Sequence, residues 1–435
     1  MLSAFNTAAQ SLSVNTTGAT AHSSALLDVS SVNKGMLIPR VSLTGITDVA
    51  TIVAPATSLL IYNTNAAIAG GSGAGYYYYS GTQWVKIIDA VTPGNSWSLT
   101  GNSGTTAGIN FIGTTDSVSL VFKVNNNNAG KIDVTLKNAG FGEKTLLANT
   151  TGTGNTAVGF QSLLTNTAGN GNTAAGYQSM YKNTADGNTA FGYQSLYENG
   201  SVPYNSAFGY QALYLNTGGD NSAMGYAALR ANSSGSFNTA MGTSALALNQ
   251  SGSKNTAIGA RALNLNTLGN ENTATGTYAL LNNQGGSYNT AYGFQSLLNN
   301  INGLGNTAAG YQSLQKNVTD GSTAFGYQAL SENTSATGNS AFGYQSLFVS
   351  TGSYNTAVGY SVLKANSSAS HNTGVGSQAL LNNTGGFENT AIGTFAMQTN
   401  VIGFGNTATG VRALYGNQNG NENTAVGKQA MFTNT

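Results

Sequence analysis

Side chains that could carry out acid-base or nucleophilic catalysis are few in this sequence, and each stands alone. There are two histidines, His22 and His371, and no cysteine, so no base and nucleophile are paired by their spacing. Acidic residues such as Asp186, Asp220 and Asp320 are single. Calcium-binding β-rolls use an Asp in a glycine-rich repeat, whereas the corresponding residues here are neutral Asn. We therefore expect no enzymatic activity, no bound metal and no cofactor.

The residues best suited to binding are aromatic and recur at a regular spacing. They form two groups of five: Phe160, Tyr177, Tyr193, Tyr210 and Tyr226, then Phe294, Tyr311, Tyr327, Tyr344 and Tyr360. Flat rings on a neutral surface of Asn and Thr can stack against sugar rings, and neighbouring amides can supply hydrogen bonds. The same rings can instead stack on one another or pack between chains. The sequence leaves both alternatives open.

These aromatic residues belong to a short repeat that runs from about Asn155 to the last residue. The pattern is Asn-Thr-Ala-x-Gly-x-x-(Ser or Ala)-(Leu or Met)-x-x-Asn; it occurs seventeen times, with successive marker glycines such as Gly159 and Gly176 16 or 17 residues apart. So short a period is typical of a solenoid, in which each copy forms one coil stacked on its neighbours. Only the segment between two copies varies in length, which indicates a surface turn.

The repeated residue types predict how one coil is built. The glycine is expected to bend the constant segment between two short strands, and the small residues near it indicate close backbone contacts. Leu or Met, as in Leu163 and Leu196, should form an apolar column. The first Asn of each copy (Asn155, Asn172 and Asn188 in the first three) and the second Asn predict two ladders. Asn tolerates the left-handed backbone of a turn, and stacked amides can bond to one another.

Such a coil has a thin core of one Leu, one Ala and one further small residue. The apolar residues before the glycines, for example Phe191 and Phe208, would then lie on a second face that needs a partner. Identical parallel chains are the simplest partner, and three is the number we favour. The expected fold class is therefore all-β, a parallel β-solenoid or β-roll of about 17 coils in a homotrimeric fibre.

The chain is expected to divide into a non-repetitive β-rich base, 1–150, and a solenoid shaft, 151–435. Glycine-rich or Asn-rich segments at 70–75 and 125–130 predict linkers. The strands expected in the base lie at 57–63, 76–89, 96–100, 117–124 and 131–136.

Charge and hydropathy exclude two classes of partner. The formal net charge is +1, only 7% of residues are charged, and no basic cluster occurs, so we expect neither nucleic acid nor an anionic membrane surface as a partner. The longest apolar runs are far shorter than the roughly 20 residues that cross a bilayer. We expect no membrane insertion.

The residues themselves resemble a known family. Asn-Thr-Ala-Val-Gly-Phe-Gln-Ser-Leu at 155–163 and Asn-Thr-Ala-Phe-Gly-Tyr-Gln-Ser-Leu at 188–196 look like repeats of bacterial and phage tail-fibre-like surface proteins, which often end in an endosialidase-type chaperone domain. More loosely, they are similar to the head repeats of trimeric autotransporter adhesins, although no coiled-coil heptads occur here. The resemblance implies a trimeric, extracellular fibre used for attachment. The chaperone or receptor-binding tip that it also implies is not among the printed residues.

Three functions follow as hypotheses. The leading one is a non-enzymatic structural fibre, carried on a cell surface, a virion or an injection device, whose N-terminal region binds a base or anchor protein. The second is a glycan-binding adhesin, in which the two aromatic groups hold a surface polysaccharide or receptor. The third is a monomeric ice- or surface-binding solenoid that uses its Thr ladder.

Overall fold

The computed structural model describes residues 11–87, 101, 103, 105, 106, 109 and 111–434, and these contain strands, turns and loops but no helix. The chain divides into two compact units, Met1–Ile112 and Gly113–Thr435. The all-β class predicted from the repeats is confirmed. The strand expected at 96–100 lies outside the described residues.

The N-terminal unit contains two small sheets. In the first, β1 (Leu12–Asn15) pairs with β2 (Leu27–Ser30) in parallel. The second has the order β3 (Arg40–Val41), β4 (Leu60–Asn63), β5 (Gly75–Tyr79), β6 (Trp84–Lys86), with a parallel first pair and antiparallel pairs after it. The glycine-rich segment 70–75 joins β4 to β5 within this sheet, so it is not a linker between domains.

A buried tryptophan and a buried carboxylate hold this unit together. Trp84 is 1% exposed, and its indole Nε1 donates to the backbone oxygen of Asp48 at 2.6 Å. The Asp48 carboxylate accepts from the backbone N–H groups of Thr44 and Thr51 at 2.8 and 2.9 Å, and from both threonine hydroxyls. These hydrogen bonds, led by the one from the Thr44 backbone, hold the pKa of Asp48 well below its usual range.

A hairpin leads into the solenoid. β7 (Leu120–Val124) and β8 (Asn127–Asp133) are antiparallel, β8 is antiparallel to β9 (Asn138–Phe141), and β9 is parallel to the first repeat strand. The hairpin turn is made by Asn125 and Asn126, both with positive φ, because Asn adopts this conformation more readily than most residues. The segment 125–130 is therefore a turn and a strand, and the prediction of a linker there was wrong.

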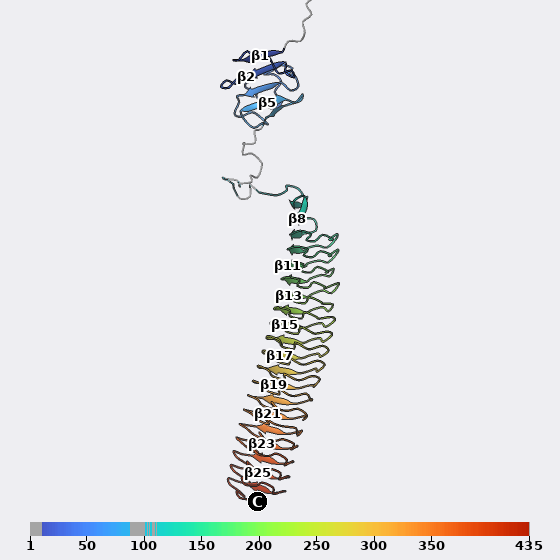
Figure 1. Cartoon of the computed structure of the whole chain (residues 1–435), viewed down its shortest axis with the longest axis vertical. Coiled ribbons are helices and arrows are strands. Elements are labelled where there is room, and N and C mark those ends of the chain that lie inside the picture. Colours follow the sequence, from blue (N-terminus) through green and yellow to red (C-terminus); the bar gives the residue numbers. More distant parts are fainter. Residues whose placement is uncertain are drawn as a thin grey trace, which may run out of the picture. The chain divides into compact units, whose positions relative to one another are not determined.

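Each repeat contributes one three-residue strand, and Figure 1 shows these strands stacked in a single column. Every strand is parallel to the next, with Thr or Ser aligned on Thr or Ser and Ala aligned on Ala in all but one coil, where Gly374 replaces the Ala. The strands are β10 (Thr156–Val158), β11 (Thr173–Ala175), β12 (Thr189–Phe191), β13 (Ser206–Phe208), β14 (Ser222–Met224), β15 (Thr239–Met241), β16 (Thr256–Ile258), β17 (Thr273–Thr275), β18 (Thr290–Tyr292), β19 (Thr307–Ala309), β20 (Thr323–Phe325), β21 (Ser340–Phe342), β22 (Thr356–Val358), β23 (Thr373–Val375), β24 (Thr390–Ile392), β25 (Thr407–Thr409) and β26 (Thr424–Val426).

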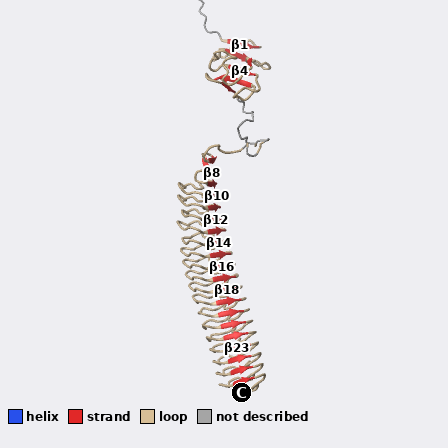
Figure 2. Ribbon diagram, turned by 180° about the vertical axis from the view of Figure 1, so that it is seen from behind, coloured by secondary structure: helices blue, strands red, loops and turns tan. Residues whose placement is uncertain are grey.

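The rest of each coil consists of turns, as the tan segments beside the strand column in Figure 2 show. The second strand expected after the glycine does not form. Instead the residues two and four positions after the glycine have positive φ, 56° at Gln161 and 50° at Leu163 in the first repeat. The turns still bond from coil to coil, since Leu163 N donates to Ser179 O at 3.0 Å.

The marker glycine is required by both conformation and space. Gly159 has φ +117°, and a Cβ there would lie 2.5 Å from the carbonyl oxygen of Gly176 in the next coil. A side chain would thus be strained and would also push neighbouring coils apart.

The core combines an apolar column with two amide ladders. Ala157 and Leu163 are fully buried, and so are Asn155 and Asn166. In the first ladder the side-chain Oδ1 of Asn155 accepts from the backbone N–H of Asn172 at 2.9 Å; in the second, side-chain amides bond directly, as from Asn166 to its counterpart one coil earlier at 3.0 Å. No Asn of either ladder has a positive φ in the described coils. These residues are therefore used for their hydrogen-bonding side chains and not for a left-handed backbone.

Candidate functional site

The two aromatic groups form two continuous columns on the surface of the solenoid. From Phe160 to Tyr226 successive ring centroids are 5.0–5.4 Å apart with interplanar angles of 5–18°. From Phe294 to Tyr360 the corresponding values are 5.1–5.4 Å and 6–15°. The stacking follows from the parallel register, which brings identical positions of adjacent coils to the spacing of adjacent strands. The rings therefore stack on one another, one of the two alternatives left open by the sequence.

These stacked rings remain accessible on one side. Tyr193 is 41% exposed and Tyr327 42% exposed. Because each inner ring has a neighbouring ring against both faces, the surface presents overlapped rings and their edges rather than separate flat faces. A bound sugar would therefore contact the exposed edges of the stacked rings.

A ladder of glutamine side chains lies directly after each aromatic column in the sequence. Gln178 Nε2 donates to Gln161 Oε1 at 2.8 Å and Gln194 Nε2 to Gln178 Oε1 at 2.9 Å. The second column has the same ladder, for example from Gln328 to Gln312 at 3.0 Å. The sequence analysis missed these ladders, although a glutamine after eight of the ten aromatic residues was a signal that could have identified them.

The strand column has an outward face that carries bulky apolar side chains. The first and third residue of each strand point outward, and the third is apolar in most coils; Phe191 and Phe325 are 41% and 42% exposed. Thr or Ser occupies the first position and is only partly exposed in most coils. This face is not the flat array of Thr that ice binding needs, so we do not propose ice binding.

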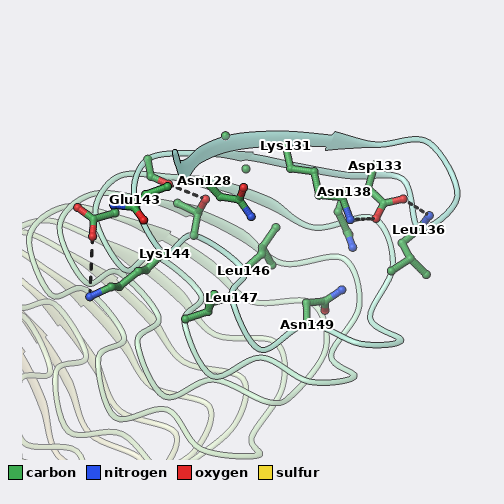
Figure 3. Close-up of a pocket in the computed structure, with 15 residues that line it drawn as sticks. Asn128, Lys131, Asp133, Leu136, Asn138, Glu143, Lys144, Leu146, Leu147 and Asn149 are labelled. Atoms are coloured by element: carbon green, nitrogen blue, oxygen red, sulfur yellow. Dashed lines mark hydrogen bonds and ion pairs between the residues drawn. The ribbon is translucent and has the colours of Figure 1, made fainter. Parts of the chain in front are cut away.

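A hollow of about 600 Å³ lies at the first coils of the second unit, under the hairpin. In Figure 3, Glu143 and Lys144 lie on one side of it and Asp133 on the other. The Asp133 carboxylate is paired with Lys131 Nζ at 2.7 Å and accepts from two backbone N–H groups. The bond from Lys131 lowers the pKa of Asp133. This carboxylate is therefore fully used in holding the turn after β8.

The residues with catalytic potential are not brought together. His22 bonds to Ser24 at 2.7 Å, and the His371 ring stacks on Tyr354 at 5.4 Å in a surface turn. Among the described residues, no group of three or more His, Asp or Glu is placed to hold a metal ion. No helix long and apolar enough to cross a membrane occurs in that part of the chain.

The structure also reveals one coil that the repeat pattern did not include. β9 occupies the position of a repeat strand, Gly142 has φ +130° like the marker glycines, and Leu146 has positive φ like the core leucines. Asn138 and Asn149 take the places of the two ladder residues. The spacing of 17 residues back from Gly159 was the available signal. Residues 113–150 thus belong to the compact unit of the solenoid, while the functional division into base and shaft stays a prediction.

Part of the chain is similar to a known family. A family model described as a phage tail like trimerisation region matches residues 13–107, a range that includes most of β1 and all of β2–β6. Comparison with curated proteins and with solved structures gives no match. The trimerisation region suggests self-association and a place on a virion appendage, and together with the β-solenoid it fits a phage tail-fibre-like structural protein.

Proposed function

We propose that this chain forms the shaft of a trimeric, tail-fibre-like appendage that attaches a virion or injection device to a surface. The observation that carries the proposal is the outward column of bulky apolar side chains along the strands, such as Phe208 and Phe342. A monomer in water rarely exposes so long an apolar stripe, whereas parallel copies of the same chain would cover it.

The N-terminal unit supports the same conclusion independently. Leu12 and Val14 on β1 and Leu27 and Val29 on β2 are 41–61% exposed, and they lie at or next to the region that matches a trimerisation family. Apolar side chains exposed on paired strands are typical of a surface that another chain covers. Each unit thus has its own surface for self-association.

The solenoid is suited to span a distance. Seventeen repeat strands at about 4.8 Å each correspond to a shaft of roughly 80 Å. Its surface is neutral and its interior is filled by side chains, so the role of the shaft is mechanical and not enzymatic. The N-terminal unit would face a base or anchor protein, and the far end would carry the part that makes contact with the surface.

The mass of the native particle tests this proposal. We expect three copies of the 44.3 kDa chain by native mass spectrometry. Phe208→Asp should weaken the trimer because it places a charge on the outward column, whereas Leu268→Asp, at a turn residue that is 57% exposed, should leave it unchanged. A monomeric wild-type protein would refute the proposal.

A second candidate function is contact with a surface glycan. It is favoured by the exposed sides of the two aromatic columns and by the Gln ladders next to them. The double variant Tyr193→Ala, Tyr327→Ala should then lose binding to an array of bacterial surface polysaccharides. Tyr204→Ala, at an exposed tyrosine outside the columns, is the control. Unchanged binding by the double variant would exclude the aromatic columns as the site.

A further inference from the structure

The repeats of the solenoid follow a longer period of eight coils. From Gly159 to Gly293 the spacings between marker glycines are 17, 16, 17, 16, 17, 17, 17 and 17 residues, and the same order recurs from Gly293 to Gly427. Positions 134 residues apart, such as these glycines, are therefore equivalent. Sixteen of the seventeen repeat coils thus form two successive copies of one eight-coil unit.

Surface features recur with this period. Each unit contains one five-ring aromatic column and one Gln ladder. An ion pair between neighbouring coils also recurs, Lys182 with Glu198 at 2.7 Å and Lys316 with Glu332 at 2.6 Å. These features lie on different parts of the coil, so the repetition is not confined to one stripe. It is not complete, since the ion pair of Lys254 with Glu271 has no counterpart in the second unit.

The outward apolar column repeats identically at five of its eight positions. Its residues are Val, Ala, Phe, Phe, Met, Met, Ile, Thr in β10–β17 and Tyr, Ala, Phe, Phe, Val, Val, Ile, Thr in β18–β25. If two parallel chains pack through this column in register, residues of the same size meet at every level. A shift by one coil would set Ala175 of one chain beside a Phe or Val of another, which leaves gaps and clashes.

A shift by eight coils restores the match of sizes. Ala175 would then meet Ala309 and Phe191 would meet Phe325, and five of the nine paired levels would be identical. Met would meet Val at two further levels and Val would meet Tyr at the last two, so the match is close but not complete. The displacement is about 38 Å, from about 4.8 Å per coil. Eight of the seventeen repeat strands in each chain would lose their partner, so this register would bury about half as much surface.

We propose that the outward column is the docking surface for a second copy of this chain, that it is complementary in two registers, and that the N-terminal unit selects the unshifted one. The proposal rests on the trimeric shaft proposed above. An N-terminal unit that associates with its own copies holds the starts of all chains close together, and this high local concentration favours the unshifted register as the shafts pack along their length.

The absence of cysteine from the sequence makes the register measurable by cross-linking. Phe208 and Phe342 are equivalent positions on the column, 37% and 39% exposed. Chains with Phe208→Cys and a tag are coexpressed with chains that carry Phe342→Cys and a different tag, and a short bis-maleimide is added. With an intact N-terminal unit we expect links between like positions only. Links from 208 to 342 would show that the unit does not select the register.

The decisive comparison disrupts the N-terminal unit, which is proposed to select the register, in the full-length chain. Trp84→Ala in both chains deletes the buried centre of the N-terminal unit and touches no residue of the solenoid; limited proteolysis confirms that the unit has opened. Links from 208 to 342 should then rise from background to a fraction comparable with the like-position links. Leu268→Cys and Ile402→Cys, an equivalent pair outside the column at 57% and 56% exposure, should give few links in either background.

Each outcome separates the two proposals. Missing like-position links in the chains with an intact N-terminal unit would refute the trimeric shaft itself. If those links form but Trp84→Ala yields no link from 208 to 342, or abolishes all links, selection between two registers is overturned while the trimeric shaft stands.

Discussion

The buried Asn ladder predicts that one isosteric substitution will be strongly destabilising. Asn283 is fully buried, and its Nδ2 donates to Asn266 Oδ1 at 2.7 Å and to Gly286 O at 2.8 Å. Its Oδ1 accepts from Asn300 at 3.0 Å. Asn283→Asp keeps the shape and the acceptor but replaces the donor by an oxygen, which then faces two other oxygens.

The magnitude follows from the groups left unpaired. Asn266 Oδ1 loses its donor at about 1–3 kcal/mol, whereas Gly286 O keeps its bond from Asn272 Nδ2 at 2.8 Å, so we expect a loss of roughly 2 kcal/mol in the free energy of unfolding. Burial among oxygens raises the pKa of the new carboxyl above the unfolded value of about 3.9. A protonated carboxyl can donate one of the two bonds, so the loss should shrink as the pH falls towards about 4 and grow as it rises above that value.

Urea unfolding followed by circular dichroism, at about pH 4 and about pH 7, measures this difference relative to the wild type. Asn302→Asp, the same chemical change at an exposed turn residue, is the control and should alter stability by less than about 0.5 kcal/mol. Equal effects of the two substitutions, or an Asn283→Asp effect that does not depend on pH, would refute the account of the ladder.

Three further predictions concern the core and the N-terminal unit. Leu280→Ala should lower the free energy of unfolding by about 2–5 kcal/mol because it leaves a cavity in the apolar column, whereas Leu268→Ala at an exposed turn should have little effect, as urea unfolding will show. Ser322 replaces an Asn of the first ladder, and its Oγ is the one buried side-chain polar atom without a partner in the described part of the chain. Ser322→Asn should restore the ladder and raise the midpoint temperature of thermal unfolding; a lower midpoint would contradict the prediction. The lowered pKa of Asp48 means that its stabilising hydrogen bonds are fully present above about pH 4 and weaken as the pH falls further. Asp48→Asn should therefore destabilise the N-terminal unit at neutral pH and make its stability less sensitive to acid. Trp84 fluorescence during unfolding measures both effects.

The sequence predicted the solenoid, its apolar column and its ladders, because each depends on a residue type that recurs at a fixed spacing. It did not predict the turns that replace the second strand. Leu163 has φ +50°, a conformation that leucine avoids in isolation. Hydrogen bonds to the next coil impose it, and their effect becomes visible only when the coils are stacked.

The additional coil was missed for a related reason. In 138–149 the Ala of the strand is replaced by Gly140 and the Ser or Ala after the glycine by Thr145, so the residue types depart from the pattern while the spacing does not. The two exchanges compensate each other, since a Cβ at Gly140 would lie 2.9 Å from the Thr145 hydroxyl. The aromatic columns could be located from the sequence but their stacking could not be distinguished from the alternatives, since it depends on the register between coils.

The direction of the bonds between coils determines how the shaft responds to pulling. Backbone and amide hydrogen bonds both run from one coil to the next, as between Asn283 and Asn266, and therefore lie along the direction of tension. The interfaces between coils are loaded in series and bear the same force. The weakest interface therefore opens first, and its extension lowers the tension on the others. One opened coil of 16 or 17 residues extends to about 50 Å of chain. Pulled along its axis, the solenoid would thus lengthen in discrete steps of one coil each.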